Sequence, residues 1–381
     1  MLLIALILVT VAIAALIGRD LWSARAVPLL EPRHHPTTTP VSVIIPARNE
    51  AARIGRLLDG LARQTALNFE VIVIDDNSED ETAALVNARA ERLPGLRVLT
   101  GAPLPSGWAG KCWACWQAAQ AAEHPWLLFL DADTAVAPEM ISTIVTRAEQ
   151  APRDFLTLLP VLELGSMAER VLMPAFVALI HAVFPFDLVN DPRSRLAMAN
   201  GQCILIRRAV YFATGGHAAV RDSVLEDVSL ARLVKHQGYR IEAAASTGLL
   251  WVRMYTNLSE VAEGLRKNAW AGYEAGGWRS AWGGIRQAFL AFVPSLLLLA
   301  GLLALVLDHP SAHLLLAFGL LQWALTAIYW CYGVAHLNRI HPAWGLLLPL
   351  GTLSYFVLAG LAWISIRRGE GIQWKGRTYD R

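Results

Sequence analysis

The sequence predicts an α/β domain built on a parallel β-sheet, with transmembrane helices before and after it. Three observations lead to this fold class. Short β-branched runs alternate with helical stretches between residues 41 and 133, the pattern of βαβ units whose parallel sheet is covered on both faces. Clusters of polar residues follow these strands where they end. Long apolar runs lie toward the two ends of the chain, and 55% of all residues are hydrophobic.

The first apolar run, residues 1–17, is uncharged and long enough to cross a bilayer as a helix. Arg19 and Arg25 follow the run, so an uncleaved anchor is favoured over a signal peptide. Under the positive-inside rule they place the next domain in the cytoplasm. Three more apolar runs come late in the chain: 288–307, 313–334 and 343–366. If all three cross, the basic tail lies outside, against the same rule, so a re-entrant or interfacial run remains an alternative.

We therefore expect a multi-pass protein of the plasma membrane with four parts. These are an N-terminal transmembrane anchor at 1–22, a cytoplasmic domain at 40–284, transmembrane segments at 285–366 and a basic tail at 367–381. Within the domain, residues 164–190 are apolar with sparse charge and predict either interfacial helices or an ordinary buried helix pair. The net charge of +2, without a basic stripe and interleaved aromatics, gives no sign of a nucleic-acid partner.

The linker at residues 31–40, EPRHHPTTTP, is rich in turn formers and predicts neither helix nor strand. The strands after it are expected at 41–46, 69–76, 96–100 and 126–133. Helices are expected at 50–64, 79–93 and 112–123, and another begins near Pro138. Because ligands bind beyond the carboxyl ends of the strands in such sheets, the polar clusters at those ends form the candidate site.

Asp131 and Asp133 form a DxD at the end of the last of these strands. In an extended segment, side chains two residues apart point the same way. Paired carboxylates suit Mg²⁺ or Mn²⁺, because such hard cations take oxygen ligands from the protein and from substrate phosphates. The same short motif is also consistent with two aspartates that cap the helix near Pro138.

Two further acidic pairs also have two interpretations. Asp75 and Asp76 follow the second strand and either cap the next helix or accept hydrogen bonds from a nucleoside. Glu226 and Asp227 either begin an exposed helix, whose dipole favours acids there, or provide a general base.

The ordered motifs VSVIIPARNE, VIVIDDNSED and LLFLDADT, followed by NGQCILIRRAVYFATGGH and LEDVSLARLVKHQGYR, resemble those of family-2 glycosyltransferases with the GT-A fold, the nucleotide-diphospho-sugar transferase fold. The resemblance covers about residues 41–270. It implies that the first two clusters bind the nucleotide of a UDP-sugar. It further implies that the DxD holds Mg²⁺ or Mn²⁺ against the diphosphate, and that the ED pair supplies the general base.

Carried over to this chain, the resemblance implies Asp227 as the catalytic base and Asp131 and Asp133 as metal ligands. The implied donor-binding residues are Pro46, Ala47, Arg48, Asn49, Glu50, Asp75, Asp76, Lys111, Asp131, Gln202, Glu226, Arg266 and Trp270. Arg266 and Trp270 occupy the place of the family's Q/RxxRW motif, where Ala269 replaces the second arginine. That departure leaves Arg266 or Lys267 to supply the charge toward the diphosphate, and it argues mildly against a processive polysaccharide synthase.

The implied mechanism is inverting. Asp227 accepts the proton of an acceptor hydroxyl as this attacks the anomeric carbon, while the metal ion offsets charge on the departing UDP. The membrane segments favour a lipid acceptor. The stretches GWAGKCWAC, LGSMAERVLMP and HAAVRDSVLEDVSLARLVKHQGYR look most like membrane enzymes that glucosylate hydroxylated carotenoids, such as hydroxychlorobactene glucosyltransferases, and hopene-associated glycosyltransferases. This implies UDP-glucose as the donor and a terpenoid, carotenoid or hopanoid, as the acceptor.

Alternatives remain from other classes. A polyprenyl-phosphate sugar transferase would carry extra basic residues near Asp227, and Arg207, Arg208 and Arg221 keep this function open. A ceramide-type enzyme is suggested by the WKGRTY-like tail at 374–379. A non-catalytic membrane scaffold is disfavoured by the intact acidic motifs.

Cys112 and Cys115 form a CxxC, a spacing used in redox and zinc sites. No second CxxC or paired histidine lies nearby in the sequence, so we expect these cysteines and Trp116 to pack on one buried helix face. The neighbouring Lys111, which follows Gly110 at the start of that helix, is the residue expected to reach the diphosphate.

Overall fold

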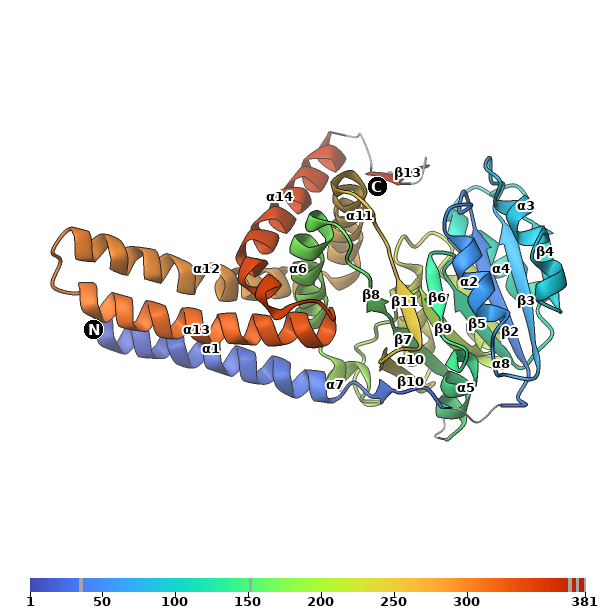
Figure 1. Ribbon diagram of the computed structural model, residues 1–381, viewed down its shortest axis with the longest axis horizontal. Helices are drawn as coiled ribbons and strands as arrows, with labels where there is room; N and C mark the ends of the chain where they lie inside the picture. The colour runs from blue at the N-terminus through green and yellow to red at the C-terminus, as the bar shows by residue number, and fades with distance from the viewer. Residues whose placement is uncertain (34–36, 151–152, 369–371, 375–376, 380–381) are drawn as a thin grey trace. The chain divides into compact units, whose positions relative to one another are not determined.

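The structure, a computed structural model, describes residues 1–33, 37–150, 153–368, 372–374 and 377–379 (Figure 1). The chain folds into two compact units. The α/β unit contains Ala26–Glu163 and Phe186–Met254, and the helical unit contains Met1–Arg25, Leu164–Pro185 and Tyr255–Arg381. The segment expected to contain a helix pair at 164–190 is therefore divided between the two units.

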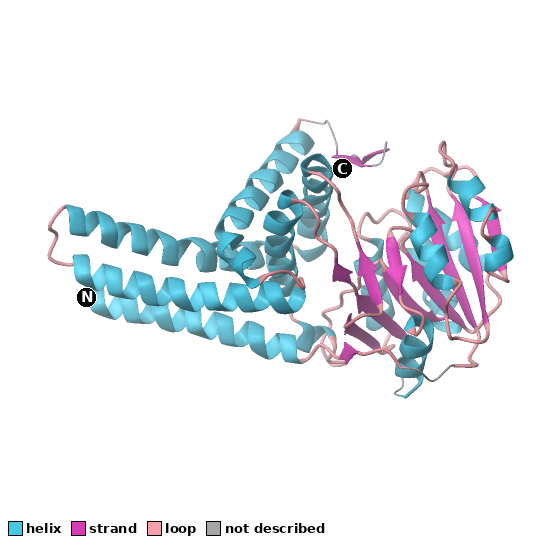
Figure 2. Ribbon diagram, in the orientation of Figure 1, coloured by secondary structure: helices cyan, strands magenta, loops and turns pink. Residues whose placement is uncertain are grey.

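An eight-stranded mixed sheet forms the centre of the α/β unit (Figure 2). In spatial order its strands are β1 (Leu29–Leu30), β10 (Ile241–Ser246), β7 (Phe155–Leu159), β9 (Cys203–Arg207), β5 (Trp126–Leu130), β2 (Val41–Ala47), β3 (Phe69–Asp75) and β4 (Leu96–Thr100). The expected strands are confirmed with small shifts at their ends. A second small sheet has the order β6 (Thr134–Val136), β11 (Leu250–Val252) and β8 (Val161–Leu162).

The four expected strands, β2, β3, β4 and β5, are parallel as predicted, but the sheet also contains an antiparallel strand that was not predicted. β9 runs antiparallel to both β5 and β7, whereas the other neighbouring strands of the large sheet are parallel. Its first residue, Cys203, pairs with Leu130, the last residue of β5. β9 therefore enters the sheet at the edge where its neighbours leave it, so it has to run in the opposite direction.

Helices cover both faces of the sheet. The helices of this unit are α2 (Ile54–Leu61), α3 (Thr82–Asn87), η1 (Ala90–Arg92), α4 (Gly110–Ala121), α5 (Met140–Gln150), α7 (Phe186–Val189), α8 (Arg208–Thr214), α9 (Gly216–Ala219) and α10 (Glu226–His236). Val43 and Val71 share one buried cluster with Leu57 of α2 and Ile141 of α5. Because strand side chains alternate, the equally buried Ile72 faces the opposite side, where α4 contacts β2 and β3.

The helices expected at 50–64 and 79–93 are shorter than predicted. α2 begins at Ile54, and α3 ends at Asn87. The residues before each helix form loops that hydrogen-bond to each other, as where the amide of Ala51 donates to Asp80 Oδ2 at 3.1 Å. These cross-loop bonds take the place of the first helical turns.

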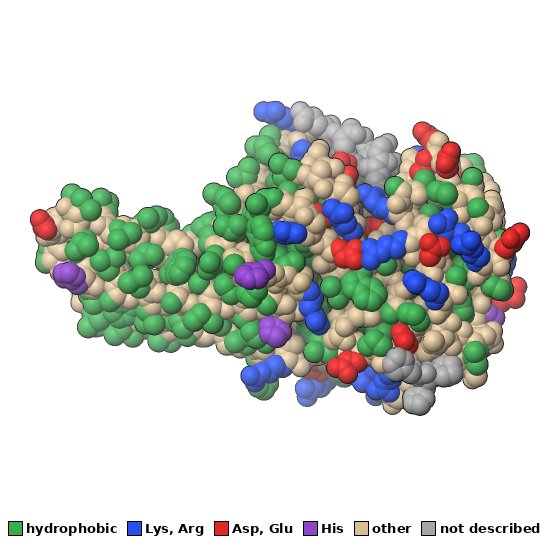
Figure 3. Space-filling model, in the orientation of Figure 1, with side chains coloured by type: hydrophobic (Ala, Val, Ile, Leu, Met, Phe, Trp, Pro, Cys, Tyr) green, Lys and Arg blue, Asp and Glu red, His purple; other side chains and the backbone are tan. Residues whose placement is uncertain are grey.

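The helical unit carries the apolar runs. Its elements are α1 (Leu2–Arg25), α6 (Met167–Val183), α11 (Leu258–Gly276), α12 (Trp278–Val306), α13 (Ala312–Leu337), η2 (Pro342–Leu347), α14 (Leu348–Arg367), β12 (Ile372–Trp374) and β13 (Arg377–Tyr379). Four stretches are long and apolar enough to cross a membrane: Leu2–Arg25, Trp278–Val306, Ala312–Leu337 and Pro342–Arg367. Hydrophobic side chains cover the surface of α1, α12 and α13 (Figure 3). α6 packs against α11, α12 and α14.

Polar contacts inside this unit join helices that are distant in sequence. Asp20 of α1 pairs with Arg286 of α12 and accepts a hydrogen bond of 2.7 Å from Tyr329 of α13. Thr10 accepts one of 2.9 Å from Gln322 Nε2. Since buried polar groups are costly without partners, these bonds specify which faces of the helices meet.

Glycines allow α12 and α13 to pack with their backbones in contact. A Cβ on Gly319 of α13 would lie 2.8 Å from the Cα of Leu298, and one on Gly301 of α12 would lie 2.7 Å from the backbone nitrogen of Leu316. Small residues at helix crossings favour association in a bilayer, where the hydrophobic effect does not drive helices together.

We predict that Gly319→Ala destabilises this helix pair, because the added methyl group meets backbone atoms that cannot move aside. Overpacking of this kind costs about 1–3 kcal/mol of unfolding free energy. Thermal unfolding in detergent measures the effect. The matched control is Gly333→Ala in the same helix, where no atom lies within 4 Å of the new Cβ. Equal melting temperatures for the two variants would contradict the close packing.

Candidate active site

The polar clusters meet at one edge of the large sheet. The parallel strands β2, β3 and β5 end there, and β9 begins there. This edge is where ligands bind in open α/β sheets. The residues after β2, β3 and β5, the residues before β9 and the first turn of α10 form the candidate site.

Lys111 joins two of the acidic clusters that are separate in the sequence. Its Nζ lies 2.7 Å from Asp131 Oδ1 and 2.8 Å from Glu226 Oε1. Burial disfavours the charge of the ammonium group, but these two carboxylates outweigh that effect and raise the pKa of Lys111 well above its usual value. The lysine therefore stays charged and holds the end of β5 to the start of α10.

Asp227 lies beside this ion-pair cluster in the first turn of α10. Its Oδ2 accepts a hydrogen bond of 2.7 Å from the amide of Gly201, and its Oδ1 accepts one of 2.8 Å from the amide of Val228. Burial and the charge of Glu226 raise the pKa of Asp227 to about 6, while Lys111 and the two amides act in the opposite direction. The carboxylate is thus fixed in orientation and poised to exchange a proton near neutral pH.

Gly201 is a functional position that sequence reasoning missed. A Cβ there would lie 2.9 Å from Lys111 Nζ, 3.2 Å from Glu226 Oε1 and 3.3 Å from Asp227 Oδ2. Only glycine leaves the room in which these three side chains converge. The signal in the sequence was the NGQ triplet, from which Gln202 alone was selected.

Gln202 presents a buried acceptor at the same edge. Its side chain is 6% exposed, and its Oε1 has no hydrogen-bond partner among the residues that the structure describes. The main chain of Gln202 is fixed, because its amide donates to Asn200 Oδ1 at 2.9 Å and its carbonyl accepts from Asp131 at 3.4 Å. A ligand that donates a hydrogen bond would satisfy this oxygen.

The two aspartates of the DxD lie in a turn, so the expectation of an extended segment is wrong. β5 ends at Leu130, and Thr134 closes the turn by donating from its amide and its hydroxyl to the carbonyl of Asp131. The alternative was that the two aspartates cap the helix near Pro138, which is α5. At the start of α5, however, it is Gln64 Oε1 that accepts the hydrogen bond from the amide of Ile141. The turn places both aspartates directly after β5, at the edge of the sheet.

The donor set of Asp131 and Asp133 fits a hard divalent cation. Asp131 already holds one positive charge, the ammonium of Lys111. No group of three or more His, Cys, Asp or Glu side chains that could bind a metal occurs within the described part of the chain. A site with two protein carboxylates suits Mg²⁺ or Mn²⁺, because such ions often complete their coordination with substrate phosphates and water.

The loops after β2 and β3 are tied to one another. Arg48 Nη1 donates to the carbonyl of Asp76 at 2.9 Å, and Asn49 Oδ1 accepts from the amide of Glu79 at 2.8 Å. Asp75 Oδ1 accepts from the amide of Ser78 at 3.2 Å and so closes a turn instead of capping α3. These bonds preorganise the edge to which the sequence assigns nucleotide binding.

Three of the residues assigned to binding the sugar-nucleotide donor have buried side chains. Ala47 and Glu50 are buried, and Asp76 is 6% exposed. Pro46 lies within β2. A nucleotide contact by these residues remains a prediction. Because the side chain of Ala47 is buried, a contact at this residue would have to come from its backbone atoms.

Arg266 and Trp270 lie on α11 of the helical unit. Arg266 Nη2 donates to Ser365 Oγ of α14 at 2.7 Å. Their assignment to the diphosphate stays a prediction.

The CxxC is a packing feature. Cys112 and Cys115 are buried and unbonded to each other, and Cys112 Sγ lies 3.5 Å from the carbonyl of Val220. Burial raises the pKa of both thiols, which suppresses the reactive thiolate. Trp116 is half-buried and packs on Tyr211 and Phe212. The expected packing on one face of α4 is confirmed for the cysteines.

Arg207 and Arg208 were two of the basic residues that left a polyprenyl-phosphate acceptor as an alternative. Their side chains pack on aromatic rings away from Asp227. Arg207 pairs in register with Trp126, the first residue of β5, at the opposite edge of the sheet. Its guanidinium stacks 4.5 Å from the centre of that indole ring, and Arg208 stacks 4.8 Å from the ring of Phe212.

Residues 42–226 match the family described as Glycosyl transferase family 2. The chain carries a family-2 glycosyltransferase domain. Among similar proteins, the 4,4'-diaponeurosporenoate glycosyltransferase of Staphylococcus aureus (strain USA300) is 27% identical over 346 residues, 89% of this chain and 88% of that protein. The protein of the same name from Staphylococcus haemolyticus is 26% identical over 225 residues, and the match spans 59% of its length.

A solved structure shares the fold of this glycosyltransferase. The mannosyltransferase from Pyrobaculum calidifontis, in complex with GDP-Man and Mn²⁺, aligns with a TM-score of 0.50 at 19% identity, over 85% of this chain and 98% of that chain. The GT-A fold predicted from the motifs is confirmed.

We predict that the double variant Cys112→Ala/Cys115→Ala keeps sugar-transfer activity and loses about 1–2 kcal/mol of unfolding free energy, because only buried volume is removed. Lys111→Ala, on the same helix, should lose most activity. Transfer assays and thermal unfolding of both variants measure this. Inactivation of the cysteine variant at unchanged stability would restore a thiol or metal role.

Proposed function

We propose that this glycosyltransferase moves glucose from UDP-glucose to a carotenoid-type lipid, with inversion at the anomeric carbon. One observation carries the proposal. The carboxylate of Asp227 is held by two amides and has a raised pKa, next to a lysine that binds Asp131. A base of this kind beside a cation-binding carboxylate is what activation of an acceptor next to a diphosphate requires.

The donor would bind along the sheet edge. The loops after β2 and β3 would take the nucleoside, with Arg48, Asn49 and Asp75 exposed enough to contact it. Asp131 and Asp133 would hold a divalent cation, which offsets the charge of the diphosphate when bound. Lys111 would add a second positive charge, and Gln202 Oε1 would accept a hydrogen bond from the sugar.

Asp227 would perform the proton transfer. As the acceptor oxygen bonds to the anomeric carbon, its proton passes to Asp227, and the bond from that carbon to the UDP oxygen breaks with its electron pair on UDP. One displacement from the face opposite to UDP gives inversion. The two amides on Asp227 keep its oxygens in place and need no rearrangement during the reaction.

The acceptor follows from the relatives and the membrane helices. The similar staphylococcal proteins are named for 4,4'-diaponeurosporenoate, which supports a carotenoid-type acceptor here. Four helices that suit a bilayer support an acceptor that is dissolved in the membrane. Arg19 and Arg25, in the last part of α1 after its apolar run, favour a plasma-membrane enzyme whose catalytic unit faces the cytoplasm.

Two acceptor groups fit this class. A hydroxyl needs the base and gives a glycoside, which is our proposal. The compound for which the relatives are named, 4,4'-diaponeurosporenoate, has the suffix of a carboxylate, and a carboxylate acceptor would give a sugar ester without a base. Mild alkaline hydrolysis distinguishes them, since it cleaves the ester and leaves the glycoside.

We predict that cells producing this protein with a carotenoid pathway accumulate a glycosylated carotenoid that disappears with Asp227→Asn. Chromatography and mass spectrometry of lipid extracts measure the product. Asp191→Asn, the same substitution outside the site, is the control. The inactive variant should still be stabilised thermally by UDP with Mn²⁺, whereas Asp131→Asn/Asp133→Asn should lose the Mn²⁺-dependent part. Product formation by Asp227→Asn would refute the base assignment.

The raised pKa of Asp227 also predicts a pH dependence. The base works deprotonated, so kcat/KM should fall as the pH drops below about 6. Because Glu226 contributes to that raised value, Glu226→Gln should move the acidic limb downward by roughly half a unit to one unit. Measurement of pH profiles for both proteins tests this. If the acidic limb of the kcat/KM profile does not move in Glu226→Gln, or if the profile has no acidic limb, an acceptor that is already deprotonated would be favoured.

A further inference from the structure

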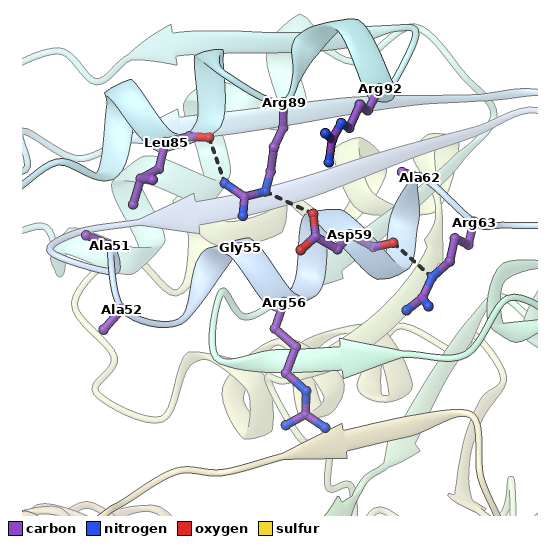
Figure 4. A pocket seen from close by; sticks show the side chains of 10 residues that line it. All are labelled: Ala51, Ala52, Gly55, Arg56, Asp59, Ala62, Arg63, Leu85, Arg89 and Arg92. Carbon is purple, nitrogen blue, oxygen red and sulfur yellow. Dashed lines mark hydrogen bonds and ion pairs between the residues drawn. The ribbon is translucent and has the colours of Figure 1, made fainter.

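A groove on the α/β unit uses none of the residues assigned to the active site. It lies between α2 on one side and α3 with η1 on the other, and its volume is about 720 Å³ (Figure 4). Small residues of the first part of α2 and of the loop before it, such as Ala51 and Gly55, form much of its lining. The groove is therefore open and has room for a ligand.

Positive charge dominates the groove. Arginine is its main polar side chain: the lining contains four arginines and a single carboxylate, Asp59. The arginines are Arg56, Arg63, Arg89 and Arg92. Guanidinium groups are planar and donate paired hydrogen bonds, which matches the oxygens of phosphate.

Arg89 is held across the groove. Its Nε lies 3.0 Å from Asp59 Oδ1, and its Nη1 donates to the carbonyl of Leu85 at 3.2 Å (Figure 4). A Cβ on Gly55 would lie 2.7 Å from Arg89 Nη2, so glycine leaves the space that this guanidinium occupies. The one carboxylate that lines the groove, Asp59, is therefore already paired with Arg89.

Arg63 and Arg92 supply uncompensated charge. Both are exposed, and neither forms an ion pair with a carboxylate in the described ranges of the chain. Arg63 Nε donates to the main-chain carbonyl of Asp59 at 3.1 Å, which leaves the end of its guanidinium open. Arg56 points away from Arg89 and Arg92 and pairs with Glu163 (Figure 4).

We propose that this groove is a second anion site, which binds phosphate groups through Arg63 and Arg92 with Arg89 at its floor. The phosphates come from one of two sources, the headgroups of anionic phospholipids or a soluble diphosphate. In a protein with membrane helices, arginines on a cytoplasmic unit meet an anionic leaflet, to which such side chains are attracted. Contact with headgroups would hold the catalytic unit at the surface from which a lipid acceptor arrives.

The experiment compares the full-length protein with Arg63→Gln/Arg92→Gln. Both side chains are exposed, so the fold should remain intact, and unchanged thermal unfolding verifies this. The matched control is Arg193→Gln/Arg195→Gln, which removes two equally exposed charges from the same unit. One arm titrates pyrophosphate into detergent-solubilised protein, with a chelator present. The other arm measures hydrogen exchange at residues 54–63 and 82–92 in nanodiscs of phosphatidylcholine with and without phosphatidylglycerol.

Loss of two phosphate contacts should weaken binding roughly tenfold in the groove variant and leave the control unchanged. Protection by phosphatidylglycerol that the groove variant alone loses assigns the phosphates to lipid headgroups. A pyrophosphate affinity that this variant alone loses assigns them to a soluble diphosphate. If the groove variant behaves as the control in both arms, all phosphate binding lies elsewhere and the proposal is overturned.

Discussion

The bridge that Lys111 makes between Asp131 and Glu226 is the interaction on which the site depends. β5 and α10 each bring carboxylates to the same sheet edge, and such groups repel one another when partly buried. The ammonium at 2.7 and 2.8 Å from the two acids offsets this repulsion and fixes the distance between strand and helix. Asp227 is held next to the bridge by the amide of Gly201. Without the lysine, charge repulsion would open the cluster that orients the base.

The position of Lys111 is in turn set by how α4 packs. The amide of Ala109, just before the helix, donates to the carbonyl of Arg221 at 2.6 Å. One turn further, Cys112 packs its sulfur against the carbonyl of Val220. These contacts hold the helix start against the segment that leads into α10. This close approach requires a small buried side chain at position 112. Packing therefore explains the presence of Cys112 without redox or zinc chemistry.

Sequence reasoning succeeded where the information is local and failed where it depends on distant pairing. Continuous β-branched runs located the strands. The ordered acidic motifs singled out Asp131 and Asp227, and Lys111 was singled out by its place after Gly110 at the start of a helix. β9 was not predicted as a strand, and its direction depends on where the chain re-enters the sheet after a long excursion. Gly201 was missed for a similar reason, since the three side chains that exclude a Cβ come from two distant helices, α4 and α10. Conversely, Arg207 looked close to Asp227 in sequence but lies at the far edge of the sheet.

The electrostatics of the cluster bear on which acceptor group the site accommodates. Lys111 is shared between Asp131 and Glu226, and the negative charge of Glu226 acts on Asp227. In the proposed function a cation and the diphosphate would occupy the Asp131 side, and Asp227 would face the acceptor. A neutral hydroxyl approaches this carboxylate without repulsion and gains a hydrogen bond to it, whereas an anionic acceptor meets a like charge at close range. A carboxylate acceptor would therefore need Asp227 to be protonated, and since its raised pKa of about 6 lies below neutral pH, the ionised form prevails there. The same group that would serve a hydroxyl as a base would thus select against an anion at neutral pH.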